Sequence, residues 1–458
     1  MEQFLRQLQT IPEAAELIRR VEEGGCPAAV SGLQPVQRAC VGAAVAAACG
    51  RPAVFLCGDE REVQVLSADL ETLTGRRPVT LLGREWQFRP GAVGSRDWER
   101  SRLAALYALA QGDAPVVVAT ADGLMARTLP PETLRSLAIT LEVGGQAELG
   151  ALAEQLLSAG YTRCEQVEGV GQFALRGGIL DVFSPLMDQP VRCEFFDDEI
   201  DSMGAFDPGT QRRTRNVSSA RILPAAEVLP HCAPGGLPGL ADQLTALAEK
   251  LAKKQKTEAI VQTLREDAER LRSGAAPGAA DRYLAAIYPT VTAGVHYLPP
   301  DAVVFLSESG RVDERVKNTV LQQKQDVEAL LSAGVLAGEY AHLTLTAEVL
   351  YAALEDFPVI LEDSLPTSRH PLRPRGLLTM NAKQLSSYGG SLETAVTDLE
   401  HYRSSGSAVL VLCGGETRAK NLHRLLEEKG IPATLDLSGA AMPAAGEVRL
   451  SLGALSAG

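Results

Sequence analysis

Short apolar runs that alternate with helical segments constrain the fold of this chain most strongly. The runs at 28–30, 52–57 and 115–120 are rich in β-branched and small apolar residues, and amphipathic stretches of helical length separate them. Strands that are apolar on both faces belong to parallel sheets covered by helices on each side. A similar buried strand is expected at 303–306, and a further helix–strand–helix–strand unit follows near the end. The pattern therefore predicts an α/β fold.

A different pattern occupies 161–215. Two runs, 173–176 and 179–183, flank Gly177-Gly178, and the run 191–196 ends in an acidic turn at 197–199. Alternating strands joined by glycine turns are typical of antiparallel hairpins. We therefore expect a small β-rich domain inserted into the α/β domain.

Composition and charge exclude several classes of protein. The 458 residues include 44 Lys plus Arg and 57 Asp plus Glu, a net charge of −13, which argues against a stand-alone DNA-binding module. The eight cysteines form no CxxC pair, so neither a zinc site nor a disulfide framework is indicated. The N-terminus has no signal-peptide pattern, and no apolar stretch approaches the roughly 20 residues that span a bilayer. We expect a cytoplasmic protein with no membrane contact.

One segment, 30–36, lies where a phosphate-binding loop would lie, between a strand and a helix. Such a loop needs glycines, a lysine for the phosphates and a serine or threonine for magnesium. Only Gly32 is present, and no Lys-Ser/Thr pair follows it. A plain strand–helix connection is the favoured interpretation. The acidic run 197–201 lacks calcium-loop spacing and is interpreted as a solvated turn. No catalytic or metal-binding residue is predicted.

The inserted segment interleaves arginines with phenylalanines. Arginine and aromatic residues are enriched at the energetic centres of protein–protein interfaces. Composition alone leaves two alternatives open, an interaction surface or an ordinary hairpin core with surface arginines. The arginines are Arg163, Arg176, Arg192, Arg212, Arg213 and Arg215.

Longer motifs within this segment are recognisable. Residues 167–183 read VEGVGQFALRGGILDVF and 192–202 read RCEFFDDEIDS, followed by FDP at 206–208. These motifs resemble the signature of the UvrB homology module. Within that group, the glycine pair after Arg176 and the ILPA continuation at 222–225 resemble bacterial transcription-repair coupling factors, the Mfd family.

The resemblance implies a domain arrangement. Residues 1–128 and 216–345 would be two halves of a degenerate RecA-like domain of the P-loop NTPase type. Residues 129–215 would be an inserted, small β-rich α+β domain that binds UvrA, and 346–458 a separate small α/β domain. Family members continue into an RNA-polymerase-binding domain and two ATP-driven translocase domains, so this chain is expected to be an N-terminal fragment or a truncated product.

The same resemblance accounts for the incomplete phosphate loop. Pro35 and Val36 would replace the Lys and Thr of the UvrB loop. The second nucleotide motif would fall at 306–309, with Ser307 at the position of the magnesium-binding Asp and only Glu308 retained. A degenerate nucleotide site and no cofactor in this fragment are therefore expected. ATP and magnesium would act in the translocase domains of the longer parent.

The implied function is recruitment of UvrA to stalled RNA polymerase in transcription-coupled nucleotide excision repair. The resemblance implies that the residues that contact UvrA are Arg163, Arg176, Phe183, Arg192 and Glu194. Ala174 departs from the pattern, because UvrB proteins carry an arginine there, and this predicts a weaker interface than that of UvrB. RNA polymerase and duplex DNA would be partners of the parent's other domains. The alternative is a UvrB-like helicase fragment with its own ATPase, which the replaced loop residues disfavour.

Overall fold

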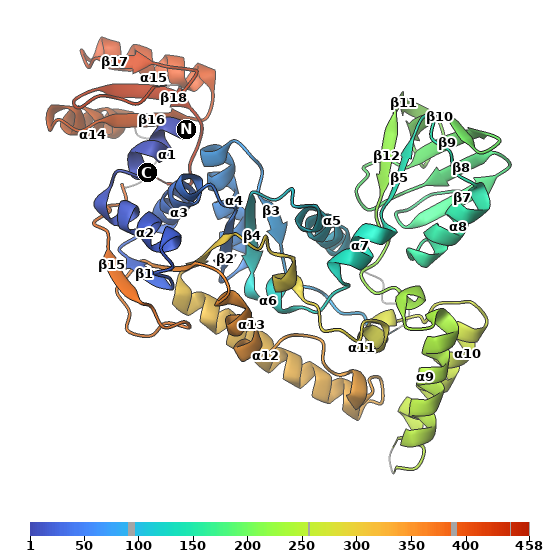
Figure 1. Ribbon diagram of the computed structural model, residues 1–458. Coiled ribbons are helices and arrows are strands. Elements are labelled where there is room, and N and C mark those ends of the chain that lie inside the picture. The colour runs from blue at the N-terminus through green and yellow to red at the C-terminus, as the bar shows by residue number, and fades with distance from the viewer. Residues whose placement is uncertain (90–96, 255–256, 386–391, 440, 458) are drawn as a thin grey trace.

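The centre of the molecule is a seven-stranded parallel sheet (Figure 1). The structure is a computed structural model that describes residues 1–89, 97–254, 257–385, 392–439 and 441–457. The strand order is β15-β1-β14-β13-β2-β4-β3, and every neighbouring pair is parallel. The predicted α/β fold class with a parallel sheet is confirmed. The strands are β1 (Ala28–Ser31), β2 (Ala53–Cys57), β3 (Val79–Leu81), β4 (Val116–Thr120), β13 (Val303–Ser307), β14 (Val359–Asp363) and β15 (Gly376–Thr379).

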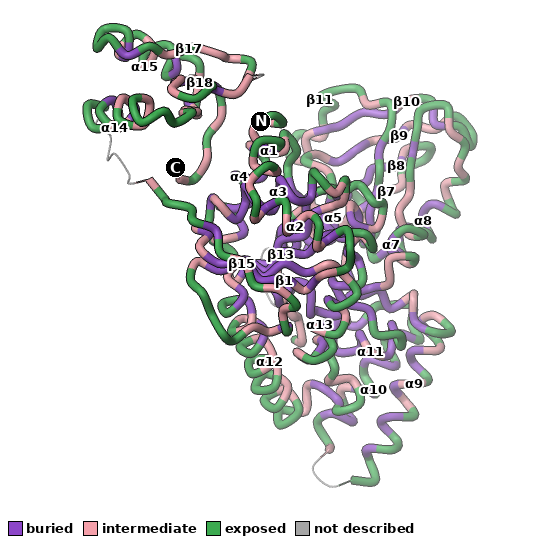
Figure 2. The backbone as a smooth tube through the Cα atoms, turned by 60° about the vertical axis from the view of Figure 1, so that its left-hand side comes forward, coloured by how far each residue is buried: buried purple, intermediate pink, exposed green. Residues whose placement is uncertain are grey.

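Helices cover both faces of this sheet, and the strands divide their side chains between two cores. In β2, Val54 and Leu56 belong to one core, whereas Phe55 and Cys57 belong to the other. This alternation explains why the strands are continuous apolar runs in the sequence. The buried strands occupy the interior of Figure 2. One face packs α1 (Glu2–Leu8), α2 (Pro12–Glu22), α3 (Pro35–Cys49) and α4 (Glu60–Thr74); the other packs α5 (Asp97–Gln111), α6 (Ala121–Met125), α7 (Pro131–Leu137), α11 (Leu284–Ile287), α12 (Ser309–Ser332) and α13 (Ala347–Leu354).

The inserted domain is a separate β-rich body. Its six-stranded sheet has the order β11-β10-β9-β8-β7-β6 and is antiparallel except for the β6–β7 pair. Helix α8 (Leu149–Ser158) packs against one face, and β5 (Ile139–Glu142) pairs with β12 (Ser219–Ile222) where the chain enters and leaves. The predicted inserted β domain is confirmed. Its strands are β6 (Thr162–Arg163), β7 (Gln172–Arg176), β8 (Ile179–Val182), β9 (Val191–Phe196), β10 (Glu199–Phe206) and β11 (Arg213–Asn216).

A helical hairpin follows the inserted domain. Helices α9 (Gly236–Leu251) and α10 (Glu258–Arg272) pack along their lengths and project away from the sheet (Figure 1). Leu244 and Leu264 are fully buried in this region, so the hairpin is held by an apolar seam. Short 3-10 helices lie at Pro230–Cys232, Ala280–Tyr283, Gly294–Tyr297 and Gly338–Tyr340.

The predicted boundary between residues 345 and 346 cuts through the main sheet and needs correction. The five residues of β14 are all buried, and the strand inserts between β1 and β13; β15 then pairs with β1. The small unit's own elements begin only at α14 (Leu392–Ser404). They continue through β16 (Val409–Cys413), α15 (Glu416–Glu428), β17 (Ala433–Leu435) and β18 (Val448–Leu452), around a parallel sheet of order β16-β18-β17.

The last residues return to the main domain. The Ser456 hydroxyl and backbone N–H donate to the two carboxylate oxygens of Asp69 on α4, each at 2.6 Å. Burial raises the pKa of Asp69, and the two bonds from Ser456 oppose that shift. This contact ties the small unit back to the main domain.

Three further observations concern the described residues as a set. No helix among them is both long and apolar enough to cross a bilayer. No group of three or more His, Cys, Asp or Glu side chains in the described ranges is arranged to hold a metal ion. The eight cysteines are free thiols.

Close packing of α3 on the sheet makes Gly42 sensitive to substitution. A Cβ at this position would lie 2.5 Å from the Phe55 ring, which stacks on Phe305 at 4.8 Å. We expect Gly42→Ala to lower the free energy of unfolding by about 1–3 kcal/mol through overpacking, despite alanine's higher helix propensity. Urea denaturation measures the change. Gly310→Ala on α12 is the matched control, because nothing lies within 4 Å of its Cβ, and it should be neutral or stabilising.

Candidate functional site

The register of the inserted sheet gathers charged side chains on one face. Asp181 on β8 pairs with Arg192 on β9, and Glu194 pairs with Ile179. Residues two apart on a strand share a face, so Arg192, Glu194 and Phe196 form a row. Arg176 on β7 lies on this same face, because it pairs with Ile179. The opposite face packs against α8. We call this exposed side the arginine face: Arg176, Asp181, Arg192, Glu194 and Phe196.

A buried carboxylate holds the two arginines of this face. Asp181 is fully buried and accepts from Arg192 Nε at 2.7 Å and Arg192 Nη2 at 2.8 Å, a bidentate pair. Arg176 Nη2 donates to the same carboxylate at 2.6 Å. The bond to Asp181 raises the pKa of Arg192. Asp181 therefore fixes the direction of both guanidinium groups.

Aromatic rings lie beneath these charges. The Arg192 guanidinium carbon lies 4.7 Å from the centre of the Phe206 ring, and Phe206 packs with Phe183 in a small buried cluster. Phe183 is only 8 % exposed, so it supports the arginine face from below. Glu194, half-buried, accepts from the Ser202 hydroxyl at 2.7 Å.

The structure brings four of the five predicted contact residues together and separates the fifth. Arg163 on β6 is exposed, but the strand register pairs it with Phe173, whose side chain lies in the core on the α8 side. Arg163 therefore lies away from the arginine face. Two residues of the face were missed: Asp181, and Phe196, which is 75 % exposed. The alternation of the strands was the available signal for both.

The predicted degenerate nucleotide site forms a second cluster, at the carboxyl edge of the main sheet. Gly32 has a φ of 89°, and a Cβ there would lie 2.1 Å from the Met380 carbonyl oxygen. Met380 N–H donates to the Ser31 carbonyl at 2.9 Å, so the segment after β15 lies against the loop. Pro35 is the first residue of α3, and Val36 is buried behind it.

Arg38 occupies the centre of this cluster. Its side chain is 2 % exposed and donates to Ser307 Oγ at 2.9 Å, to Glu308 Oε1 at 2.6 Å and to the Leu33 carbonyl at 3.1 Å. Ser307 in turn donates to Glu62 at 2.7 Å, and Glu62 lies 3.4 Å from Arg38 Nη2. We call this the Arg38 cluster: Arg38, Glu62, Ser307, Glu308 and Ser364. Ser364 accepts from Arg38 and donates to Glu308.

The Arg38 side chain lies against the loop after β1, the kind of segment that holds phosphates in P-loop proteins. Its guanidinium joins this loop to Glu62 on α4 and to Glu308 at the start of α12. Glu308 has a left-handed backbone, with φ of 54°, and directs its carboxylate to Arg38. The residues present therefore suit an internal ion cluster better than a nucleotide.

A buried carboxyl group lies beside the Arg38 cluster. Glu362 on β14 is fully buried, and within the described parts of the chain neither of its carboxyl oxygens has a hydrogen-bond partner. Burial raises the pKa of Glu362 well above its usual range, and Arg38 only partly opposes this shift. Burial therefore disfavours the ionised form of this carboxyl group.

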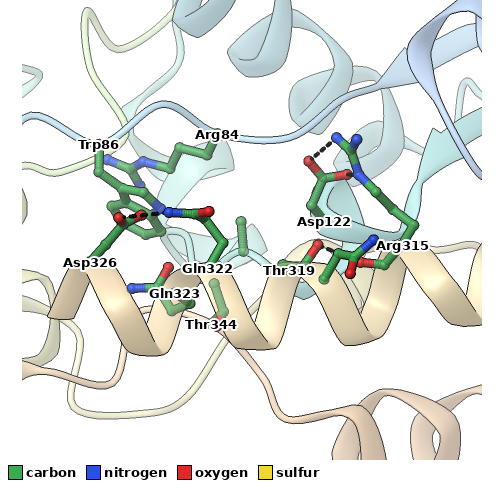
Figure 3. A pocket seen from close by; sticks show the side chains of 11 residues that line it. Arg84, Trp86, Asp122, Arg315, Thr319, Gln322, Gln323, Asp326 and Thr344 are labelled. Carbon is green, nitrogen blue, oxygen red and sulfur yellow. Dashed lines mark hydrogen bonds and ion pairs between the residues drawn. The ribbon is translucent and has the colours of Figure 1, made fainter. Parts of the chain in front are cut away.

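A polar cavity of about 390 Å³ lies between α12 and the segments that follow β3 and β4. Figure 3 shows Arg315 paired with Asp122 on one side and Gln322 paired with Asp326 on the other, with Trp86 beside the second pair. Gln323 and Thr344 also line it. The cavity contains none of the predicted site residues.

Comparison with known proteins places the arginine face within a defined class of domain. Residues 139–227 match the UvrB interaction domain family. Over most of its length the chain is also similar to proteins named transcription-repair-coupling factor. The relative from Bacillus subtilis (strain 168) is 26 % identical over 446 residues, 96 % of this chain and 38 % of the relative. The relative from Myxococcus xanthus is 29 % identical over 423 residues, 87 % of this chain and 34 % of the relative. The resemblance inferred from the motifs is thereby confirmed: the chain is similar to the N-terminal part of transcription-repair-coupling factors, and it spans 38 % or less of the length of these two relatives.

The buried Glu362 predicts an unusual pH dependence of stability. Its folded-state pKa lies above its unfolded value, so the folded state keeps a proton that the unfolded state releases above about pH 4.3. The stability that this group contributes is full below that pH and is lost as pH rises through the folded pKa. We expect Glu362→Gln to stabilise the protein relative to wild type as pH rises above about 4.3 toward the folded-state pKa, by at most about 1.4 kcal/mol per pH unit.

Urea denaturation of both proteins at several pH values measures this difference. At the acid end the two should be similar, because both side chains are then neutral. A constant difference across the range would contradict the prediction.

Proposed function

We propose that this chain recruits UvrA in transcription-coupled nucleotide excision repair, and that the arginine face is the contact surface. The observation that carries the proposal is the fully buried Asp181, which holds Arg176 and Arg192 on one open face inside the region that matches the UvrB interaction domain. The names of the relatives, transcription-repair-coupling factor, supply the biological setting.

The chemistry of the face suits a partner with carboxylates. Arg176 is 47 % exposed and uses one nitrogen for Asp181, so the remaining donors of its fork can pair with a carboxylate of the partner. Glu194 adds one negative charge to the row, which suits a partner surface of mixed charge. Phe196 supplies exposed aromatic area beside these charges, as interface centres require.

We also propose that the Arg38 cluster makes the RecA-like domain a scaffold without nucleotide chemistry. The alternative, a UvrB-like helicase fragment with its own ATPase, would require a nucleotide to displace a buried guanidinium from two carboxylates. In this proposal, the parts of the relatives that this chain does not cover carry two other functions. These functions are ATP-driven translocation on duplex DNA and contact with RNA polymerase.

Arg176→Ala should weaken UvrA binding markedly. If the guanidinium is desolvated against a carboxylate of UvrA, truncation costs about 2–5 kcal/mol, or at least about 30-fold in Kd, chiefly through faster dissociation. Asp181→Asn should also weaken binding, since it removes the charge that orients both arginines. Titration against purified UvrA measures each value.

Arg212→Ala is the matched control, because Arg212 is an exposed arginine of the same domain outside the arginine face. It should bind like wild type, and Arg163→Ala should have a smaller effect than Arg176→Ala. Equal affinities for wild type and an Arg176/Arg192 double alanine variant would contradict the proposed surface.

The chain should neither bind nor hydrolyse ATP. Arg38 fills the phosphate position, and the loop lacks the lysine that would hold the γ-phosphate. A fluorescent ATP analogue should show no saturable binding, and a steady-state assay no turnover above background. Magnesium-dependent turnover that disappears in Glu308→Ala would refute the scaffold proposal.

A further inference from the structure

The lysines of this chain are concentrated at one place. The sequence contains nine lysines, and four of them, Lys250, Lys253, Lys254 and Lys256, fall within seven residues. Lys256 lies outside the described residues; the other three lie at the end of α9 and in the turn that follows it. This concentration is opposite in sign to the net charge of −13. We call Lys250, Lys253 and Lys254 the lysine tip.

The fold presents the lysine tip at the far end of the projecting hairpin (Figure 1). Near this end, Leu247, Leu251 and Ile260 are buried between and beneath the two helices. The Thr257 hydroxyl donates to the Leu251 carbonyl at 2.7 Å and lies 3.0 Å from the Lys254 carbonyl. These contacts tie the start of α10 to the end of α9 and to Lys254.

The lysines of the tip are exposed. Lys253 and Lys254 are both in the exposed class, and the charges of Lys250 and Lys254 help to lower the pKa of the nearby Glu339. Lys250 is 62 % exposed and pairs with Glu339 at 3.1 Å. Exposed pairs of this kind contribute little, so Lys250 can exchange partners at small cost.

The side chains around the lysine tip favour a nucleic-acid partner over a specific protein partner. Among the described residues 247–254 and 257–261, the exposed side chains are two glutamates, three lysines and two alanines. Specific protein interfaces need aromatic, arginine or large apolar anchors, and none is exposed here. Lysine suits sequence-independent contact with phosphates, as a flexible point charge.

We propose that the lysine tip is a weak, sequence-independent contact for the phosphate backbone of duplex DNA. This site lies on the main domain, separate from the arginine face, and does not depend on UvrA binding. Three lysines would release about three counterions, so the logarithm of the binding constant should fall with the logarithm of salt with a slope near −2.7. Because the chain as a whole carries a net charge of −13, the affinity should be modest, with Kd about 10⁻⁴ M at physiological salt.

Fluorescence anisotropy of a short labelled duplex, titrated with the full chain at several salt concentrations, tests the proposal. Lys253→Glu with Lys254→Glu should weaken binding at low salt by at least about 10-fold and reduce the salt slope by about 2. The matched control is Lys420→Glu with Lys429→Glu, which makes the same charge change on and just after α15, in the small unit. Lys253→Arg with Lys254→Arg should retain binding, because both charges remain.

Three results would overturn the proposal. The tip and control variants could lose affinity equally, which would show an effect of total charge only. Wild-type binding could be absent at low salt or independent of salt. Polyglutamate could compete with wild type as well as unlabelled DNA does at equal charge concentration, which would point to an acidic protein partner instead.

Discussion

One buried guanidinium holds the carboxyl edge of the main sheet together. Arg38 bridges the loop after β1, helix α4, the start of α12 and the segment after β14, which are far apart in sequence. In a working NTPase these segments meet around a phosphate chain and a cation. Here the cation is the Arg38 side chain, and the anions are Glu62 and Glu308, so the ion pairs form entirely within the chain. These segments are therefore joined at the carboxyl edge by contacts of the chain itself.

The inserted domain also contains arginine–carboxylate pairs, but there an arginine remains partly exposed. Arg38 is 2 % exposed, whereas Arg176 is 47 % exposed, although both donate to carboxylates. A buried ion pair contributes less to stability than its Coulomb energy suggests, because both ions lose hydration. A half-exposed one retains donors for a partner while a single bond sets its direction. The exposed fraction of the side chain therefore distinguishes Arg38, which connects segments of the fold, from Arg176, which is proposed to bind UvrA.

The sequence was sufficient for the architecture but not for the contacts that orient side chains. The alternation of strand runs and helices predicted the parallel sheet, and the glycine turn at 177–178 predicted the hairpins. Strand alternation could have placed Asp181 on this face, but its pairing with Arg192 could not be predicted, because register depends on the whole sheet. Arg38 was missed because Ser307 and Glu308 are about 270 residues away. The run at β14 was placed in the wrong unit, since an apolar strand does not encode which sheet it joins.

Charge placement links these features to the acidic composition. A net charge of −13 keeps nucleic acid away from most of the surface and limits non-specific association. Against this background, a few cations act locally, since interactions between exposed charges are screened beyond about 10 Å at 0.1 M salt. The arginine face and the lysine tip lie on different bodies, the inserted sheet and the helical hairpin. Arginine forks beside aromatic rings favour a specific protein surface, whereas lysines on a bare turn favour a phosphate backbone. In the two proposals, the type of cation, more than the number of cations, distinguishes the kind of partner for each surface.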